Sequence, residues 1–251
     1  VPGVGQNRRE HGMVFSQCRL AQPVSDSFEC GGLRLLKHVL KYALTKKGLM
    51  ASSSHEVAGF IRSRAGLERP DAQIVYAPIS LEQGEDAKFA FVKWHGLQIH
   101  GFQLRPESQG SVMITSSDPA EQPVIRPNYL SCEEDRQVAL ATVRYIRKLT
   151  QSEPLRGFIE QEMVPDPELQ SDEELLANIM RIGSTVFHAS GTCKMGQDAM
   201  AVLDPRLRVR GVAGLRVADA SVMPTLVSGN SNAATMAIGW RAADLILEDA
   251  A

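Results

Sequence analysis

Two short strings near the end of the chain constrain its fold more than any other feature. The first, FHASGTCKMG over residues 187–196, places His188 in a turn rich in Gly, Ser and Thr. The second, VSGNSNAATM over residues 227–236, places side-chain amides where a small-residue helix is predicted to begin. Imidazole titrates near pH 6.5, so His188 can take a proton from a hydroxyl group at neutral pH. The strings therefore place a titratable imidazole and a predicted helix N-terminus within one C-terminal segment.

Composition narrows the class of protein. With 251 residues, 43% of them hydrophobic, the chain can bury a substantial core as one large domain or two smaller ones. Its net charge of −2 gives no basic face for a nucleic acid, and no apolar run is long enough to cross a bilayer. Four scattered cysteines predict neither a disulfide framework nor a zinc site, which favours a reducing, cytoplasmic location.

No metal site is expected. His95 and His100 are the candidate ligands, but their spacing suits neither one helix face nor one strand face, and no carboxylate accompanies them.

Apolar periodicity and turn residues predict the remaining elements. Helices are expected over residues 32–47, from Ser131, from the capping box of Ser171 and Glu174 to Met180, and over 232–248. Strands are expected at 13–20, 57–62, 73–80, within 89–104, at 112–114 and, as a buried strand, at 215–218. This alternation predicts an antiparallel sheet with helices on one side, followed by a strand–turn–helix unit.

The chain resembles the glucose–methanol–choline (GMC) family of flavin oxidoreductases. The likeness is carried by VPGVGQN with His11 at the start, by residues 104–112 and 127–130, and most specifically by residues 188–245. Arg8, Arg9 and Glu10 depart from the Leu-Gln-Asp that is usual before this histidine, which puts a role for His11 in doubt.

The resemblance implies an α/β (α+β) fold, with an antiparallel-sheet substrate domain and a C-terminal strand–helix segment that completes a doubly wound FAD-binding domain. It divides the chain into residues 1–20, the end of the FAD domain and a linker; 21–180, the substrate domain; and 181–251, the segment that completes the active site.

The resemblance also assigns roles to residues. His188 becomes the catalytic base and Asn232 its amide partner, with Asn230 a close second candidate. An isolated histidine is more often a surface or core residue, and Asn is also an ordinary helix cap. Asp219 and Ala220, in the turn after residues 215–218, become FAD contacts, although an Asx turn is the simpler reading.

Small residues at the start of the last helix, Ala233 among them, permit close approach of a flavin to the helix N-terminus. Tight helix packing alone would favour the same residues. Phe187 and Trp94 are candidate aromatic walls of a substrate pocket, and core packing is an equal alternative for Trp94.

No GxGxxG fingerprint follows a predicted N-terminal strand. GMC enzymes carry that fingerprint near their own N-terminus, so the resemblance implies a partner: an N-terminal FAD-binding half that is another chain, a cleaved segment or an unresolved portion. The expected function is FAD-dependent oxidation of an alcohol, by proton abstraction and hydride transfer to flavin N5. The alternatives are a hydroxynitrile lyase on the same fold and a non-catalytic fragment or binding subunit.

Overall fold

The computed structural model describes residues 1–83 and 89–250, which form two compact units that interleave along the sequence. Unit 1 comprises residues 1–12, 103–137 and 184–250, and unit 2 comprises residues 13–102 and 138–183. The mixture of helices and antiparallel strand pairs is the one predicted. The two units interleave, whereas the three segments expected from the sequence are consecutive and were defined by their roles. The division into those three segments stays a prediction.

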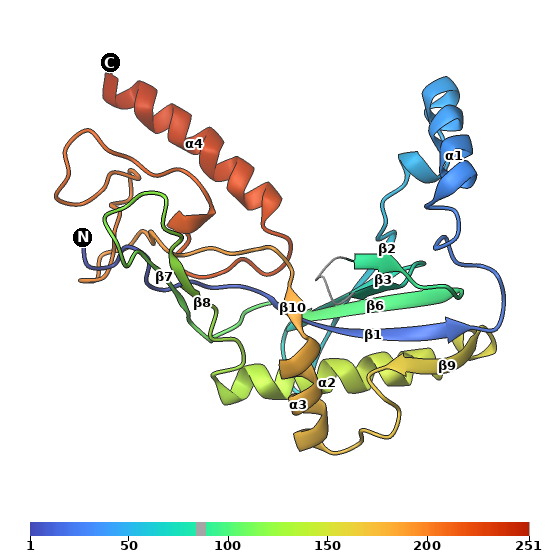
Figure 1. Ribbon diagram of the computed structural model, residues 1–251. Helices are drawn as coiled ribbons and strands as arrows, with labels where there is room; N and C mark the ends of the chain where they lie inside the picture. The colour runs from blue at the N-terminus through green and yellow to red at the C-terminus, as the bar shows by residue number, and fades with distance from the viewer. Residues whose placement is uncertain (84–88, 251) are drawn as a thin grey trace. The chain divides into compact units, whose positions relative to one another are not determined.

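Unit 2 is built on an antiparallel sheet in which β1, β6, β3 and β2 are neighbours in that order, and β9 also pairs with β1 (Figure 1). Its strands are β1 (Gly12–Leu20), β2 (Val57–Ile61), β3 (Ala72–Ala77), β6 (Gly96–Gln103) and β9 (Ile159–Val164). The antiparallel register pairs Phe15 of β1 with His100 of β6. A separate antiparallel pair is formed by β4 (Leu81–Gln83) and β5 (Phe89–Phe91). The strands expected at 13–20, 57–62 and 73–80 are confirmed, as are those within 89–104.

Three helices lie at the predicted places in the sequence, and the first of them, which has no buried residue, projects away from the sheet (Figure 1). They are α1 (Gly32–Thr45), α2 (Glu133–Thr150) and α3 (Asp172–Ile182), with short turns η1 (Leu49–Ala51) and η2 (Leu155–Gly157). Leu97 and Ile99 of β6 face the same side of the sheet, because alternate residues of a strand do so. Ile146 of α2 is buried in one cluster with both. The capping box of Ser171 and Glu174 opens α3 as predicted.

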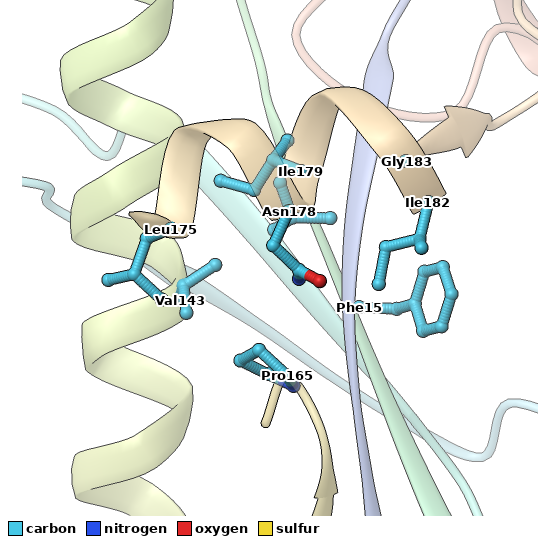
Figure 2. Close-up of a pocket in the computed structure, with 9 residues that line it drawn as sticks. Phe15, Val143, Pro165, Leu175, Asn178, Ile179, Ile182 and Gly183 are labelled. Atoms are coloured by element: carbon cyan, nitrogen blue, oxygen red, sulfur yellow. The ribbon is translucent and has the colours of Figure 1, made fainter. Parts of the chain in front are cut away.

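Between α2, α3 and β1 lies a small cavity of about 10 Å³ (Figure 2). Its lining is Val14, Phe15, Val143, Pro165, Leu175, Asn178, Ile179, Ile182 and Gly183. The amide oxygen of Asn178 accepts a hydrogen bond from Arg181 at 3.0 Å. A space of this size holds at most about one water molecule, so it is a packing gap rather than a substrate site.

Unit 1 is built around the last helix, α4 (Asn232–Ala250), which confirms the helix predicted over 232–248. Its apolar core consists of Val202, Leu203, Leu207, Val209, Val222, Ala242 and Leu245. Near its C-terminal end, Arg206 pairs with Glu248 at 3.1 Å and Arg216 pairs with Asp249. The unit also contains a hairpin of β7 (Ser111–Met113) and β8 (Val124–Arg126), the short strand β10 (Ser184–Thr185), and η3 (Ala220–Val222).

The buried strand predicted at residues 215–218 is wrong. Only one isolated bridge, between Arg208 and Arg216, lies there, and the Leu215 side chain is 49% exposed. Gly211 and Gly214 adopt positive φ just before the segment, and Asp219 begins another turn just after it. Too few extended residues remain between these turns to form a strand, so a short apolar run was a misleading signal.

Candidate active site

The first twelve residues run beside the segment that contains His188. Arg9 and Ser190 form an antiparallel bridge with N–O distances of 2.9 Å in both directions. Two residues after Arg9, the His11 carbonyl accepts from the Val186 N–H at 3.2 Å. These main-chain bonds place His11 and His188, which are 177 residues apart in sequence, side by side.

Two backbone conformations shape the turn around His188. Phe187 lies in the left-handed region at φ 62°, an uncommon conformation for a residue with a side chain, and its N–H donates to Thr185 Oγ1 at 2.9 Å. Gly191 has φ +86°, and a Cβ there would lie 2.4 Å from the Asn7 carbonyl oxygen. The glycine in the His188 string is therefore required by both its φ and its close backbone contact.

Three groups hold the half-buried His188. Its Nδ1 lies 2.9 Å from Nδ1 of His11, and its Nε2 lies 3.5 Å from the amide nitrogen of Asn230. Its backbone N–H donates to Glu10 Oε1 at 2.7 Å. The two rings meet edge to face, with centroids 5.1 Å apart and planes at 84°. Both ring nitrogens and the main chain of His188 are thus engaged, which fixes the orientation of the imidazole.

The residues that depart from the family string support this arrangement. Arg8 and Glu10 are buried and form an ion pair at 3.3 Å. The Arg8 guanidinium also lies 5.6 Å from the ring centroid of Tyr129. Glu10 thereby contacts Arg8 with one oxygen and the His188 backbone with the other. A buried carboxylate needs such partners, because an unpaired buried charge is costly.

Burial keeps both imidazoles neutral at neutral pH. Desolvation lowers the pKa of His11 to about 4, against the opposing effect of the Leu104 carbonyl. Desolvation also lowers the pKa of His188, and the negative charge of Glu10 partly opposes that shift. A neutral imidazole is the form that can accept a proton, so the site is set up for base chemistry.

Asn232 and Ala233 are exposed and form the first turn of α4. The polar contact to His188 Nε2 comes instead from Asn230, two residues before the helix. Asp219 forms the Asx turn that was the simpler reading, accepting from the Ser221 N–H at 2.8 Å, and it remains exposed at the start of η3 beside Ala220.

The two aromatic candidates lie in different units. Phe187, in unit 1, is 86% exposed, so its ring packs little against this unit. Trp94, in unit 2, lies 5.5 Å from the Arg19 guanidinium carbon, which is a cation–π contact. Their roles as pocket walls stay a prediction. Across residues 1–83 and 89–250, no group of three His, Cys, Asp or Glu side chains is placed to hold a metal.

Sequence reasoning underrated His11 and omitted Glu10. His11 is fully buried, and its Nε2 lies 3.2 Å from the Leu104 carbonyl oxygen. The sequence did point to His11, because this residue ends the N-terminal string of the resemblance. The unusual residues before it, Arg8, Arg9 and Glu10, weakened that match. Glu10 could be recognised only once the fold placed its carboxylate at the His188 backbone.

Comparison with known proteins agrees with this geometry. The family model described as GMC oxidoreductase matches residues 106–239, more than half of the chain. These residues include both His188 and Asn230.

Full-length relatives extend the likeness to nearly the whole chain. An oxygen-dependent choline dehydrogenase of Vibrio vulnificus is 39% identical over 254 residues, which cover 98% of this chain and 44% of the relative. One from Escherichia coli is 38% identical over 247 residues, covering 98% and 43%. The chain thus spans less than half the length of these relatives.

Solved structures share the fold. Pyridoxine 4-oxidase from Mesorbium loti matches with a TM-score of 0.77 and 25% identity, covering 97% of this chain and 43% of that one. A formate oxidase of Aspergillus oryzae matches with a TM-score of 0.87 and 24% identity, covering 98% and 48%.

In the described part of this chain, no helix combines the length and apolar character needed to span a membrane.

Proposed function

We propose, from the premise that this chain belongs to the GMC oxidoreductase family, that it supplies the catalytic base of an FAD-dependent alcohol oxidoreductase. The observation that carries the proposal is the fixed imidazole of His188, with its Nε2 beside the amide of Asn230. A neutral, oriented histidine next to a hydrogen-bond donor suits removal of a proton from an alcohol.

In the proposed reaction, His188 Nε2 takes the hydroxyl proton. The Asn230 amide donates to the substrate oxygen as negative charge develops there. The carbon–hydrogen bond of the same CH–OH group breaks with its electron pair, so the alcohol becomes a carbonyl compound. FAD, when bound, would supply the two-electron acceptor for this hydride. Proton and hydride together account for the two hydrogens lost by the alcohol.

The residues at the start of α4 fit a flavin. Asn232 and Ala233 are exposed. The first turn of a helix carries free N–H groups and partial positive charge, which suit the electron-rich edge of a reduced flavin. Asp219 and Ala220 are the further candidate contacts, to the ribityl and pyrophosphate part.

We propose that an N-terminal dinucleotide-binding part completes the site. It would cover the exposed apolar residues of α4, where Met236, Trp240 and Leu247 are 68%, 78% and 70% exposed. Apolar surface on that scale is characteristic of a surface that another part covers. The greater length of the choline dehydrogenases leaves room for such a part.

The substrate is an alcohol, and choline is the first to test because relatives at 38–39% identity are named for its oxidation. The relatives named above are dehydrogenases and oxidases, which favours redox chemistry over a hydroxynitrile lyase. A cytoplasmic location is proposed from the free thiols of Cys18, Cys30, Cys132 and Cys193, which suit a reducing compartment.

The test is anaerobic flavin reduction by the intact flavoprotein that contains this chain. Choline should bleach the flavin spectrum. His188→Ala should slow reduction by about 10²–10⁴-fold, the usual contribution of general acid–base catalysis. His38→Ala is the control, because His38 lies on α1 and bonds Glu29, and it should change the rate less than about twofold.

Each alternative has its own signature. Cyanide release from a cyanohydrin with an unchanged flavin would identify a lyase. An intact protein that holds no flavin would identify a binding subunit. An unchanged reduction rate in His188→Ala would remove His188 as the base.

A further inference from the structure

His11 has the environment of a residue that acts on its neighbour. Its side chain is fully buried, so it cannot itself meet a substrate from solvent. Its two ring nitrogens each have a polar atom within hydrogen-bond distance: Leu104 O at 3.2 Å from Nε2, and His188 Nδ1 at 2.9 Å from Nδ1. The Val227 backbone is a further hydrogen-bond partner of this ring and raises the pKa of His11. These contacts determine which nitrogens carry hydrogen.

The chain of hydrogen bonds ends at an acceptor, the Leu104 carbonyl oxygen. A carbonyl oxygen can only accept, so Nε2 of His11 must carry the hydrogen that it donates there. A neutral imidazole has a single N–H, so Nδ1 of His11 presents a lone pair. Burial holds the pKa of His11 near 4, which keeps this ring neutral at neutral pH.

The lone pair on His11 then sets the tautomer of His188. Two nitrogens 2.9 Å apart need one hydrogen between them, and that hydrogen must belong to His188 Nδ1. Neutral His188 therefore has its lone pair on Nε2, the atom that faces the Asn230 amide nitrogen. When Nε2 gains a proton, the Nδ1–H becomes a charge-assisted donor to His11 and strengthens.

We propose that His11 is a positioning residue that holds His188 in its Nδ1–H tautomer and stabilises the protonated ring. This inference rests on the proposed function, in which His188 is the base. Neutral His11 donates its one hydrogen to a buried carbonyl and so presents an oriented acceptor to His188. Such an acceptor fixes the tautomer and the orientation of a catalytic imidazole.

Two variants of the intact flavoprotein test the proposal. His11→Leu removes the acceptor and should slow anaerobic flavin reduction by about 10–100-fold, with the substrate dissociation constant little changed. His11→Gln should recover activity to within about fivefold, because its amide can donate to Leu104 and accept from His188. A purely packing role would instead favour the apolar variant over the amide variant.

A second measurement needs no variant of His11. Nitrogen-15 shifts of labelled histidines, assigned with the His188→Ala protein, should show His188 protonated at Nδ1 and His11 protonated at Nε2. The opposite tautomer of His188 would overturn the proposal, even if His11→Leu fails to fold. So would a wild-type reduction rate in His11→Leu when His188→Ala is inactive. If His188→Ala itself reduces flavin normally, the proposed function fails, whatever the tautomer.

Discussion

Two pairs of histidine rings lie in different units of this chain, and different forces hold them. In unit 1, His11 and His188 meet with ring centroids 5.1 Å apart. In unit 2, His55 and His100 meet at 5.2 Å, also edge to face. Burial lowers the pKa of His100 to about 4, as it does that of His11.

The two histidine pairs differ in their hydrogen bonds. His11 contacts a carbonyl with one nitrogen and His188 with the other. Within the residues described, Nε2 of His100 is buried with no hydrogen-bond partner, and the His55 Nδ1 bonds Ser54 rather than the other ring. Burial is therefore enough to make a histidine neutral, but only the partners at both nitrogens choose its tautomer and aim a lone pair.

The largest expected effect concerns the amide that faces the unit 1 pair. Asn230→Asp removes the NH₂ donor beside His188 Nε2 and adds a negative charge where the substrate oxyanion would form. Losing one oxyanion donor costs about 2.7–4 kcal/mol, so flavin reduction in the intact protein should fall at least about 100-fold.

Asn232→Asp is the matched control for this change. It adds the same charge two residues later, at the first turn of α4, where an acidic residue is compatible with the helix N-terminus. Because this turn is itself proposed to face the flavin, reduction should also fall, but by a smaller factor than in Asn230→Asp. If Asn232→Asp abolishes reduction and Asn230→Asp does not, the helix start rather than the loop before it holds the catalytic amide.

The unit 2 pair should appear in stability rather than in rate. The pKa of His100 is about 4 in the folded chain against an ordinary 6.5, so between these pH values the unfolded chain binds a proton that the folded chain does not. The free energy of unfolding should therefore fall as pH drops from 6.5 to 4, by about 3 kcal/mol from this residue. Below pH 4 this contribution does not grow further.

His100→Leu removes that titration and should flatten the pH dependence of the melting temperature of the intact protein. The loss from His11, which titrates in the same direction, should remain. His55→Leu is the control, because His55 is less buried and should change the slope less. An identical pH slope in His100→Leu and in the wild type would show that His100 is not held neutral by the fold.

Sequence patterns predicted most elements of this fold because their signals are local. Apolar periodicity located α1 and α4, and the Ser171–Glu174 box marked the start of α3. The strand expected at 215–218 failed because three or four apolar residues do not show whether a neighbouring strand exists to pair with them.

The candidate site was harder to predict because its contacts are not local. The string around His188 indicated the base, but it could not show that His11, 177 positions earlier, supplies the neighbour. Choosing between Asn230 and Asn232 required knowing where α4 begins, and helix ends are the least certain part of any pattern. Glu10 acts through a main-chain contact that no motif encodes.

The pH profile of anaerobic flavin reduction tests the central claim, that neutral His188 is the base, most directly. The titratable groups that contact His188 are His11, at its ring, and Glu10, which accepts from its backbone N–H and is paired with Arg8. Because burial lowers the pKa of His188, reduction measured between about pH 5 and pH 8 should be fast at neutral pH and decline only below about 6.5. This acid limb should be absent from the residual rate of His188→Ala. The same limb in wild type and His188→Ala would contradict the claim.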